Sequence, residues 1–161
     1  MKRGSYGKSG FIKYVVFALI VAFIVTLMLY TSSSNKPFDE IKQSVADALD
    51  KSNLKERDAA SFKRDTGLNA ADYSGVMYYA SESNISAEEV LLIRVKDESQ
   101  IQDVTEAIEE RIEGRMNDFD GYAPEEVKLL EGAKLSVRGR YIFLAVAPKA
   151  DEYLAAFGSS L

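Results

Sequence analysis

The feature that most constrains this chain is an uninterrupted apolar run over residues 14–30, with the sequence YVVFALIVAFIVTLMLY. The run holds no charge, proline or glycine, so one α-helix can satisfy all of its backbone hydrogen bonds. At about 1.5 Å per residue it covers roughly 26 Å of a hydrocarbon core that is about 30 Å thick. The sequence therefore predicts a transmembrane anchor over residues 14–30.

The flanks of the run predict its orientation. The basic residues on its N-terminal side are Lys2, Arg3, Lys8 and Lys13. By the positive-inside rule, residues 1–13 are expected in the cytoplasm and the C-terminal part outside it. A cleaved signal peptide, giving a secreted binding protein, is the alternative. Signal peptides have a shorter apolar core and a small-residue cleavage site, so the sequence favours an uncleaved anchor in a single-pass protein of the cell membrane.

Composition excludes several kinds of chemistry. All 25 acidic residues but only 16 of the 20 basic ones follow the anchor, which gives that part a net charge of −9. Nucleic acid is therefore not an expected partner, and anionic polymers or lipids are disfavoured unless a local basic patch binds them. The chain has no cysteine and no histidine, so disulfides, thiol nucleophiles, histidine-based catalysis and histidine zinc sites are excluded. No cofactor or metal is predicted, and the lack of disulfides outside the cytoplasm favours a Gram-positive bacterium.

Residues 31–36 are expected to form a flexible stem, and residues 37–161 to form one extracytoplasmic α+β domain. Apolar spacing, glycine and proline predict helices over 37–50, 54–66, 101–119, 124–131 and 150–157. Strands are predicted over 72–80, 90–95, 133–138 and 141–147. The order of these elements favours a four-stranded, mostly antiparallel sheet with helices on one face.

Two local motifs invite a functional interpretation. Lys134, Arg138 and Arg140 are expected to make a basic hairpin tip that could contact phosphate head groups or an acidic partner, although solvated hairpin tips often have this composition. The segment 117–121 (NDFDG) is similar to part of a calcium loop. Its first and twelfth positions would be Met116 and Val127, which cannot ligate calcium, so a turn after the helix is favoured.

Several segments of the chain resemble one bacterial family. The segments are TGL at 66–68, DY at 72–73, AEEVLLI at 87–93, the helix over 111–119, GYAPE at 121–125 and VRGRYIF at 137–143. In this order they resemble the domain of unknown function 4358 family, over about residues 54–157. That family consists of small envelope proteins with a lipoprotein signal or a membrane anchor. The resemblance implies no activity, and the absence of cysteine implies that the anchor here is a protein segment.

The polar residues inside these segments are the candidate functional surface, namely Glu89, Arg111, Tyr122 and Tyr141. We expect a non-catalytic binding or accessory module of the cell envelope. Its expected partners are the lipid bilayer, through residues 14–30, and another membrane or envelope protein. The alternative is an enzyme, or an enzyme subunit, that acts on an envelope polymer through carboxylates or tyrosine.

Overall fold

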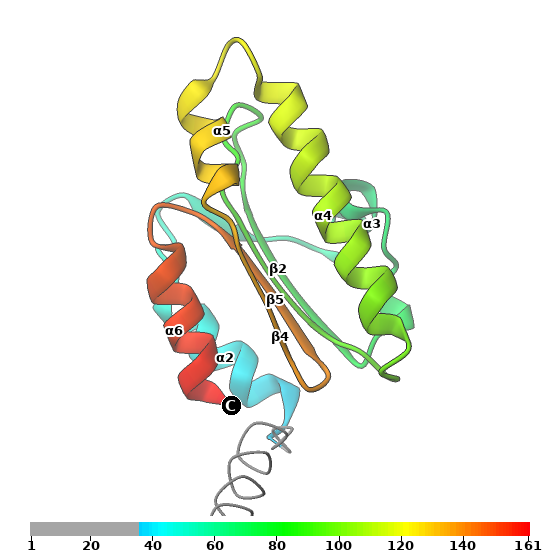
Figure 1. The fold of residues 1–161 in the computed structure, drawn as a ribbon. Helices are drawn as coiled ribbons and strands as arrows, with labels where there is room; N and C mark the ends of the chain where they lie inside the picture. Colours follow the sequence, from blue (N-terminus) through cyan, green and yellow to red (C-terminus); the bar gives the residue numbers. More distant parts are fainter. Residues whose placement is uncertain (1–35) are drawn as a thin grey trace, which may run out of the picture. The chain divides into compact units, whose positions relative to one another are not determined.

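The computed structural model describes residues 36–161, which form an α+β domain around a five-stranded sheet (Figure 1). All neighbouring strands pair antiparallel, in the order β1-β2-β3-β5-β4. The strands are β1 (Leu54–Glu56), β2 (Gly75–Ser81), β3 (Glu89–Arg94), β4 (Lys134–Arg138) and β5 (Tyr141–Val146). The predicted α+β class and antiparallel pairing are confirmed, but the predicted number of strands is wrong by one.

Helices cover both faces of the sheet, which corrects the prediction of helices on one face only. On one face α2 (Phe38–Ala48) packs beside α6 (Ala150–Ser160), and on the other lie α3 (Ala59–Thr66), α4 (Gln100–Phe119) and α5 (Pro124–Glu131) (Figure 1). A short 3₁₀ turn, η1 (Ala70–Asp72), follows α3.

The central strands explain the two layers. Successive side chains of a strand point to opposite faces, and β3 and β5 are buried at almost every position. In β3, Leu92 belongs to the core beneath α2 and α6, whereas Leu91 belongs to the core beneath α3, α4 and α5. Because strands with two apolar faces need cover on both sides, a second helical layer is required.

The predicted helix over 54–66 divides into β1 and α3. Leu54 pairs with Ser81 at the edge of the sheet, so the first residues are extended. The Asp58 carboxylate accepts the backbone N–H of Ser61 at 2.8 Å and caps the start of α3. Gly67 ends α3 in the left-handed conformation with φ of 75°, as predicted.

The other predicted elements form close to their expected bounds. Helix α4 buries Val104, Ile108 and Phe119 on its apolar stripe, and α5 begins at Pro124. Strands β4 and β5 form a hairpin through Gly139 and Arg140. Within residues 36–161 no helix is long and apolar enough to span a membrane. The predicted cytoplasmic segment, anchor and most of the stem lie outside the described residues.

Candidate functional site

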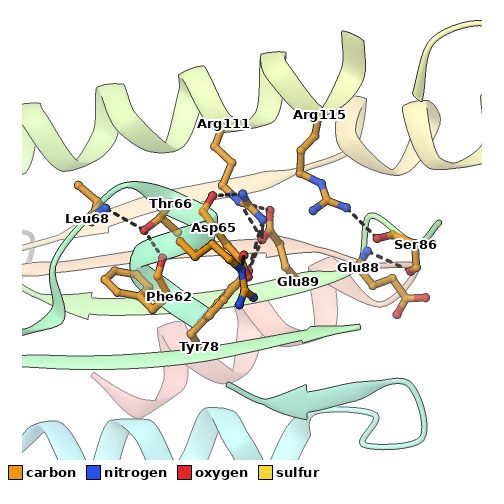
Figure 2. A network of polar contacts seen from close by, with 11 residues as sticks. Phe62, Asp65, Thr66, Leu68, Tyr78, Ser86, Glu88, Glu89, Arg111 and Arg115 are labelled. Carbon is orange, nitrogen blue, oxygen red and sulfur yellow. Dashed lines mark hydrogen bonds and ion pairs between the residues drawn. The ribbon is translucent and has the colours of Figure 1, made fainter. Parts of the chain in front are cut away.

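A buried ion pair joins the sheet to α4. Glu89 is the first residue of β3 and lies on the same face as Leu91, where its side chain is 2% exposed. From α4, the Arg111 Nε donates to Glu89 Oε1 at 3.1 Å and Oε2 at 3.0 Å, and its Nη2 donates to Oε2 at 2.8 Å (Figure 2). The geometry is that of a forked guanidinium–carboxylate pair, in which the charge of each side chain is balanced inside the protein.

Tyr78 and Asp65 extend this pair into a network. The Tyr78 hydroxyl lies 3.2 Å from both Asp65 Oδ2 and Glu89 Oε2, and it accepts from Arg111 Nη2 at 3.3 Å. Arg111 Nη1 donates to the backbone carbonyl of Asp65 at the end of α3 (Figure 2). The network therefore connects α3, β2, β3 and α4 around one guanidinium.

The network favours fixed protonation states. Burial, followed by the nearby negative charge of Glu89, raises the pKa of the Tyr78 hydroxyl well above its ordinary value, so this tyrosine stays neutral. Burial by itself would lower the pKa of Arg111, but the facing Glu89 carboxylate outweighs that effect and raises the pKa. Arg111 is thus held in its charged form.

Three more arginines lie around Arg111. Arg115, one turn further along α4, donates from Nη2 to the Ser86 carbonyl at 2.7 Å (Figure 2). Its guanidinium also packs over the Phe119 ring, 5.3 Å from the ring centroid. Arg64 of α3 pairs through its Nε with its chain neighbour Asp65 at 3.0 Å. Arg57 directly follows β1, and its backbone N–H donates to the Tyr78 carbonyl at 2.8 Å. Within residues 36–161 neither Arg57 nor Arg115 forms an ion pair.

These side chains line a cleft of about 290 Å³ beside the turn that joins β2 to β3. We call it the arginine cleft and define it by Arg57, Arg64, Arg111 and Arg115. The turn contributes polar side chains to the same wall, Ser83 and Asn84 among them. The cleft thus gathers four guanidinium groups in a domain whose net charge is strongly negative.

The remaining two candidate tyrosines lie away from this cluster. Tyr122 follows α4, is 63% exposed and packs against Phe119 with ring centroids 5.8 Å apart. Tyr141 lies on the opposite face of the sheet and near the other end of β3, since it pairs with Arg94. The structure therefore brings together Glu89 and Arg111 but neither Tyr122 nor Tyr141.

The contacts of Tyr141 support the fold. Its ring stacks on Phe38 at 6.4 Å, and its hydroxyl donates to the Lys36 carbonyl at 3.1 Å. Gly75 makes room for this stack, because a Cβ there would lie 2.5 Å from the Phe38 ring. Tyr141 therefore fixes the start of α2 against the sheet.

The predicted basic hairpin tip is only partly correct. Arg138 and Arg140 lie exposed at the β4–β5 turn, where Arg140 Nη1 donates to the Lys96 carbonyl at 3.4 Å. Lys134 begins β4, pairs with Ala145 at the other end of the hairpin and contacts Asp151 at 3.0 Å. A strand rises about 3.3 Å per residue, so Lys134 is too far along β4 to belong to the tip.

Sequence reasoning does not select Asp65 or Arg115. For Tyr78 it favours a role as a strand residue over a carbohydrate-binding face shared with Tyr73 and Tyr79. The one available signal is the spacing of Arg111 and Arg115, which puts both on one side of α4. Within residues 36–161, no group of three or more acidic side chains is placed to hold a metal ion.

The fold and the cluster define a small α+β domain with a two-sided helical cover and a buried arginine–glutamate pair beside a basic cleft. The model of the family described as "Domain of unknown function (DUF4358)" matches residues 47–147, so the chain belongs to this family. No curated protein and no solved structure matches the chain.

Proposed function

We propose that this protein is a single-pass membrane protein whose C-terminal domain lies outside the cytoplasm and acts as a non-catalytic binding or accessory module of the cell envelope. The apolar run over residues 14–30 and the basic residues before it support the anchor and its orientation. A tether of this kind raises the effective concentration of the domain for partners at the membrane surface.

The proposal that the domain is non-catalytic rests on the contacts that Glu89 makes inside the protein. It is the only buried carboxylate among residues 36–161, and Arg111 and Tyr78 occupy its two oxygens. A general acid or base has to reach the proton that it transfers, whereas this carboxylate is 2% exposed and neutralised by its partner. Its geometry favours a positioning role, in which Glu89 holds Arg111 at the base of the arginine cleft.

The anchor and its orientation can be tested with single cysteines, because the natural chain has none. Ile85→Cys puts a thiol at a position that is 71% exposed in the domain. We expect a membrane-impermeant maleimide to label this variant in intact cells. Its matched control, Ser5→Cys on the N-terminal side, should be labelled only after the cells are permeabilised.

The same samples separate the alternatives. An uncleaved anchor predicts that both thiols remain in a chain of full mass in the membrane fraction. Loss of Ser5→Cys from the mature chain would support the secreted alternative, and labelling of Ser5→Cys alone in intact cells would reverse the topology. Turnover of an envelope polymer by the purified protein, abolished by Glu89→Gln but retained in Glu88→Gln, would overturn the non-catalytic proposal in favour of the enzyme.

A further inference from the structure

We propose that the arginine cleft is a binding site for a phosphate group, presented as a mono- or diester by an envelope molecule. This inference deepens the proposed function, because it names the ligand class of the binding module and rests on that function for its biological setting. The binding chemistry itself depends only on the described domain.

Two of the guanidinium groups in the cleft carry unpaired Nε–H donors. The Nε atoms of Arg57 and Arg115 are buried, and neither forms a hydrogen bond within the described chain. Buried N–H groups are almost always paired, so two unpaired ones in arginines that line one cleft point to an acceptor supplied from outside the chain. The acceptor must be anionic or strongly polar, since both donors belong to permanently charged side chains.

The charges inside the cleft are only partly balanced by ion pairs. Three carboxylates also line it, but Asp65 is engaged by Arg64 and Tyr78, and Glu88 accepts from Asn53 at 2.7 Å. Glu82 is the remaining one and is exposed. The positive charges of Arg57 and Arg115 are therefore not neutralised within residues 36–161 by any ion pair.

The spread of the donors around the cleft favours a ligand of tetrahedral shape. The donors approach from different elements: Arg115 from α4, Arg57 from the end of β1, and the serine and asparagine side chains from the β2–β3 turn. A carboxylate offers two acceptors in one plane, whereas a phosphate offers oxygens in a tetrahedron and carries up to two charges. Arginine guanidinium groups bind phosphate oxygens through forked hydrogen bonds, and the spread of the donors fits the tetrahedral arrangement of those oxygens.

Glu89 and Tyr78 hold the Arg111 side chain at the base of the cleft. Because Arg111 is held in place, the base of the cleft needs little ordering when a ligand arrives. Arg111 and Arg115 lie one turn apart on the same helix, which keeps their spacing fixed. Arg57 and Arg115, which form no ion pair within residues 36–161, provide the local attraction for anions that the net charge of the domain otherwise opposes.

The test uses the full-length protein in maltoside micelles and inorganic phosphate as the probe, at constant ionic strength maintained with sodium chloride. Nuclear magnetic resonance spectra of the arginine Nε–H groups report directly on the two unpaired donors. We expect saturable shifts of the Arg57 and Arg115 signals during the titration and no shift of the Arg138 signal. Sodium acetate at the same ionic strength should shift the two signals only at much higher concentration.

Variants connect the response to the cleft. Arg57→Gln combined with Arg115→Gln should raise the dissociation constant for phosphate about tenfold or more, while Arg138→Gln, a matched loss of charge on the distant hairpin, should leave it unchanged. Thermal unfolding without phosphate checks that each variant folds. Glu82→Gln changes only an exposed residue of the cleft wall and should lower the dissociation constant, which keeps the test decisive if the double variant is unstable.

Two further arms identify the source of the phosphate. If the protein in nanodiscs binds free phosphate more weakly when phosphatidylglycerol is added to the phosphatidylcholine, the ligand is a lipid head group. If instead soluble poly(glycerol phosphate) competes, the ligand is a polymer, and either result supports the site. Equal responses to acetate and phosphate, no shift of either Nε–H, or equal phosphate affinity in the double variant and Arg138→Gln would overturn it. These measurements on purified protein are independent of the labelling experiment, so each proposal can fail alone.

Discussion

At the scale of single residues, Arg111 is the side chain on which the most contacts of the site converge. Its guanidinium donates to Glu89, to Tyr78 and to a backbone carbonyl in the last turn of α3, and its side chain is only 12% exposed. A buried pair of this type adds little net stability compared with apolar residues of the same size, because both charges lose their hydration. Removing one partner is costly, since the other charge then stays buried without compensation.

We therefore expect Arg111→Met to lower the free energy of unfolding by about 3–5 kcal/mol. The combination of Glu89→Leu with Arg111→Met should recover most of that loss, because no buried charge remains. Urea denaturation followed by circular dichroism measures both values. The control is Arg138→Met on the exposed hairpin, which should stay within about 0.5 kcal/mol of the natural protein. A double variant as unstable as Arg111→Met alone would show that the pair is worth more than its apolar replacement.

At the scale of elements, the turns and helix interiors depend on backbone conformation as much as on packing. Gly67 ends α3 with φ of 75°, and a Cβ built there meets no atom within 4 Å. Gly114 lies inside α4, also with open space around its Cβ position, but its φ is helical. The two positions thus differ in backbone conformation and not in available space.

Alanine at these two glycines should act in opposite directions. Gly67→Ala should destabilise the domain by about 1 kcal/mol, because alanine adopts the left-handed conformation at a cost of roughly 1–2 kcal/mol. Gly114→Ala should stabilise it by about 0.5–1 kcal/mol through helix propensity. Thermal unfolding of both variants in parallel provides the comparison. Destabilisation by Gly114→Ala would contradict the open space at this position. It would mean that this surface of α4 contacts another molecule in solution.

The elements also show how far sequence reasoning reaches. Helix α4, helix α5 and the β4–β5 hairpin were predictable because their signals are local: an apolar stripe, a proline at the first turn, and a glycine between two strands. Strand β1 was not predictable in this way. Its three residues are extended only because they pair with β2, more than twenty residues away, and local spacing favours a helix there.

The contacts within the site are likewise not predictable from local sequence signals. Glu89 and Arg111 lie in segments that carry the family resemblance, so the sequence selects both of them as candidates. That they contact each other follows from how α4 packs on the face of the sheet that carries Glu89, which no local pattern specifies. Asp65 and Tyr78 join them through the path of the chain after α3, and Arg57 reaches the same cleft only because β1 is a strand.

At the scale of the whole domain, the family match covers a shorter range of residues than the fold does. The match covers residues 47–147, which hold all five strands together with α3, α4 and α5. Nearly all of α2 and the whole of α6 lie outside it. These two helices pack together over one face of the sheet, so the matching segment contains only one of the two helical layers (Figure 1).

The missing layer leads to a prediction about the smallest folding unit. Each buried side chain of the α2–α6 core contributes roughly 1.5–3 kcal/mol, so losing several of them exceeds the total stability of about 5–15 kcal/mol typical of a domain. The helices bury Ile41, Val45, Tyr153 and Phe157 against strand residues such as Leu92 and Phe143. A fragment of residues 47–147 should therefore aggregate or bind a hydrophobic dye, while residues 36–161 should unfold cooperatively as a monomer in size-exclusion chromatography and calorimetry. A monomeric, cooperatively folded 47–147 fragment would show that the α3–α5 layer alone stabilises the sheet, and that α2 and α6 are additions to an autonomous domain.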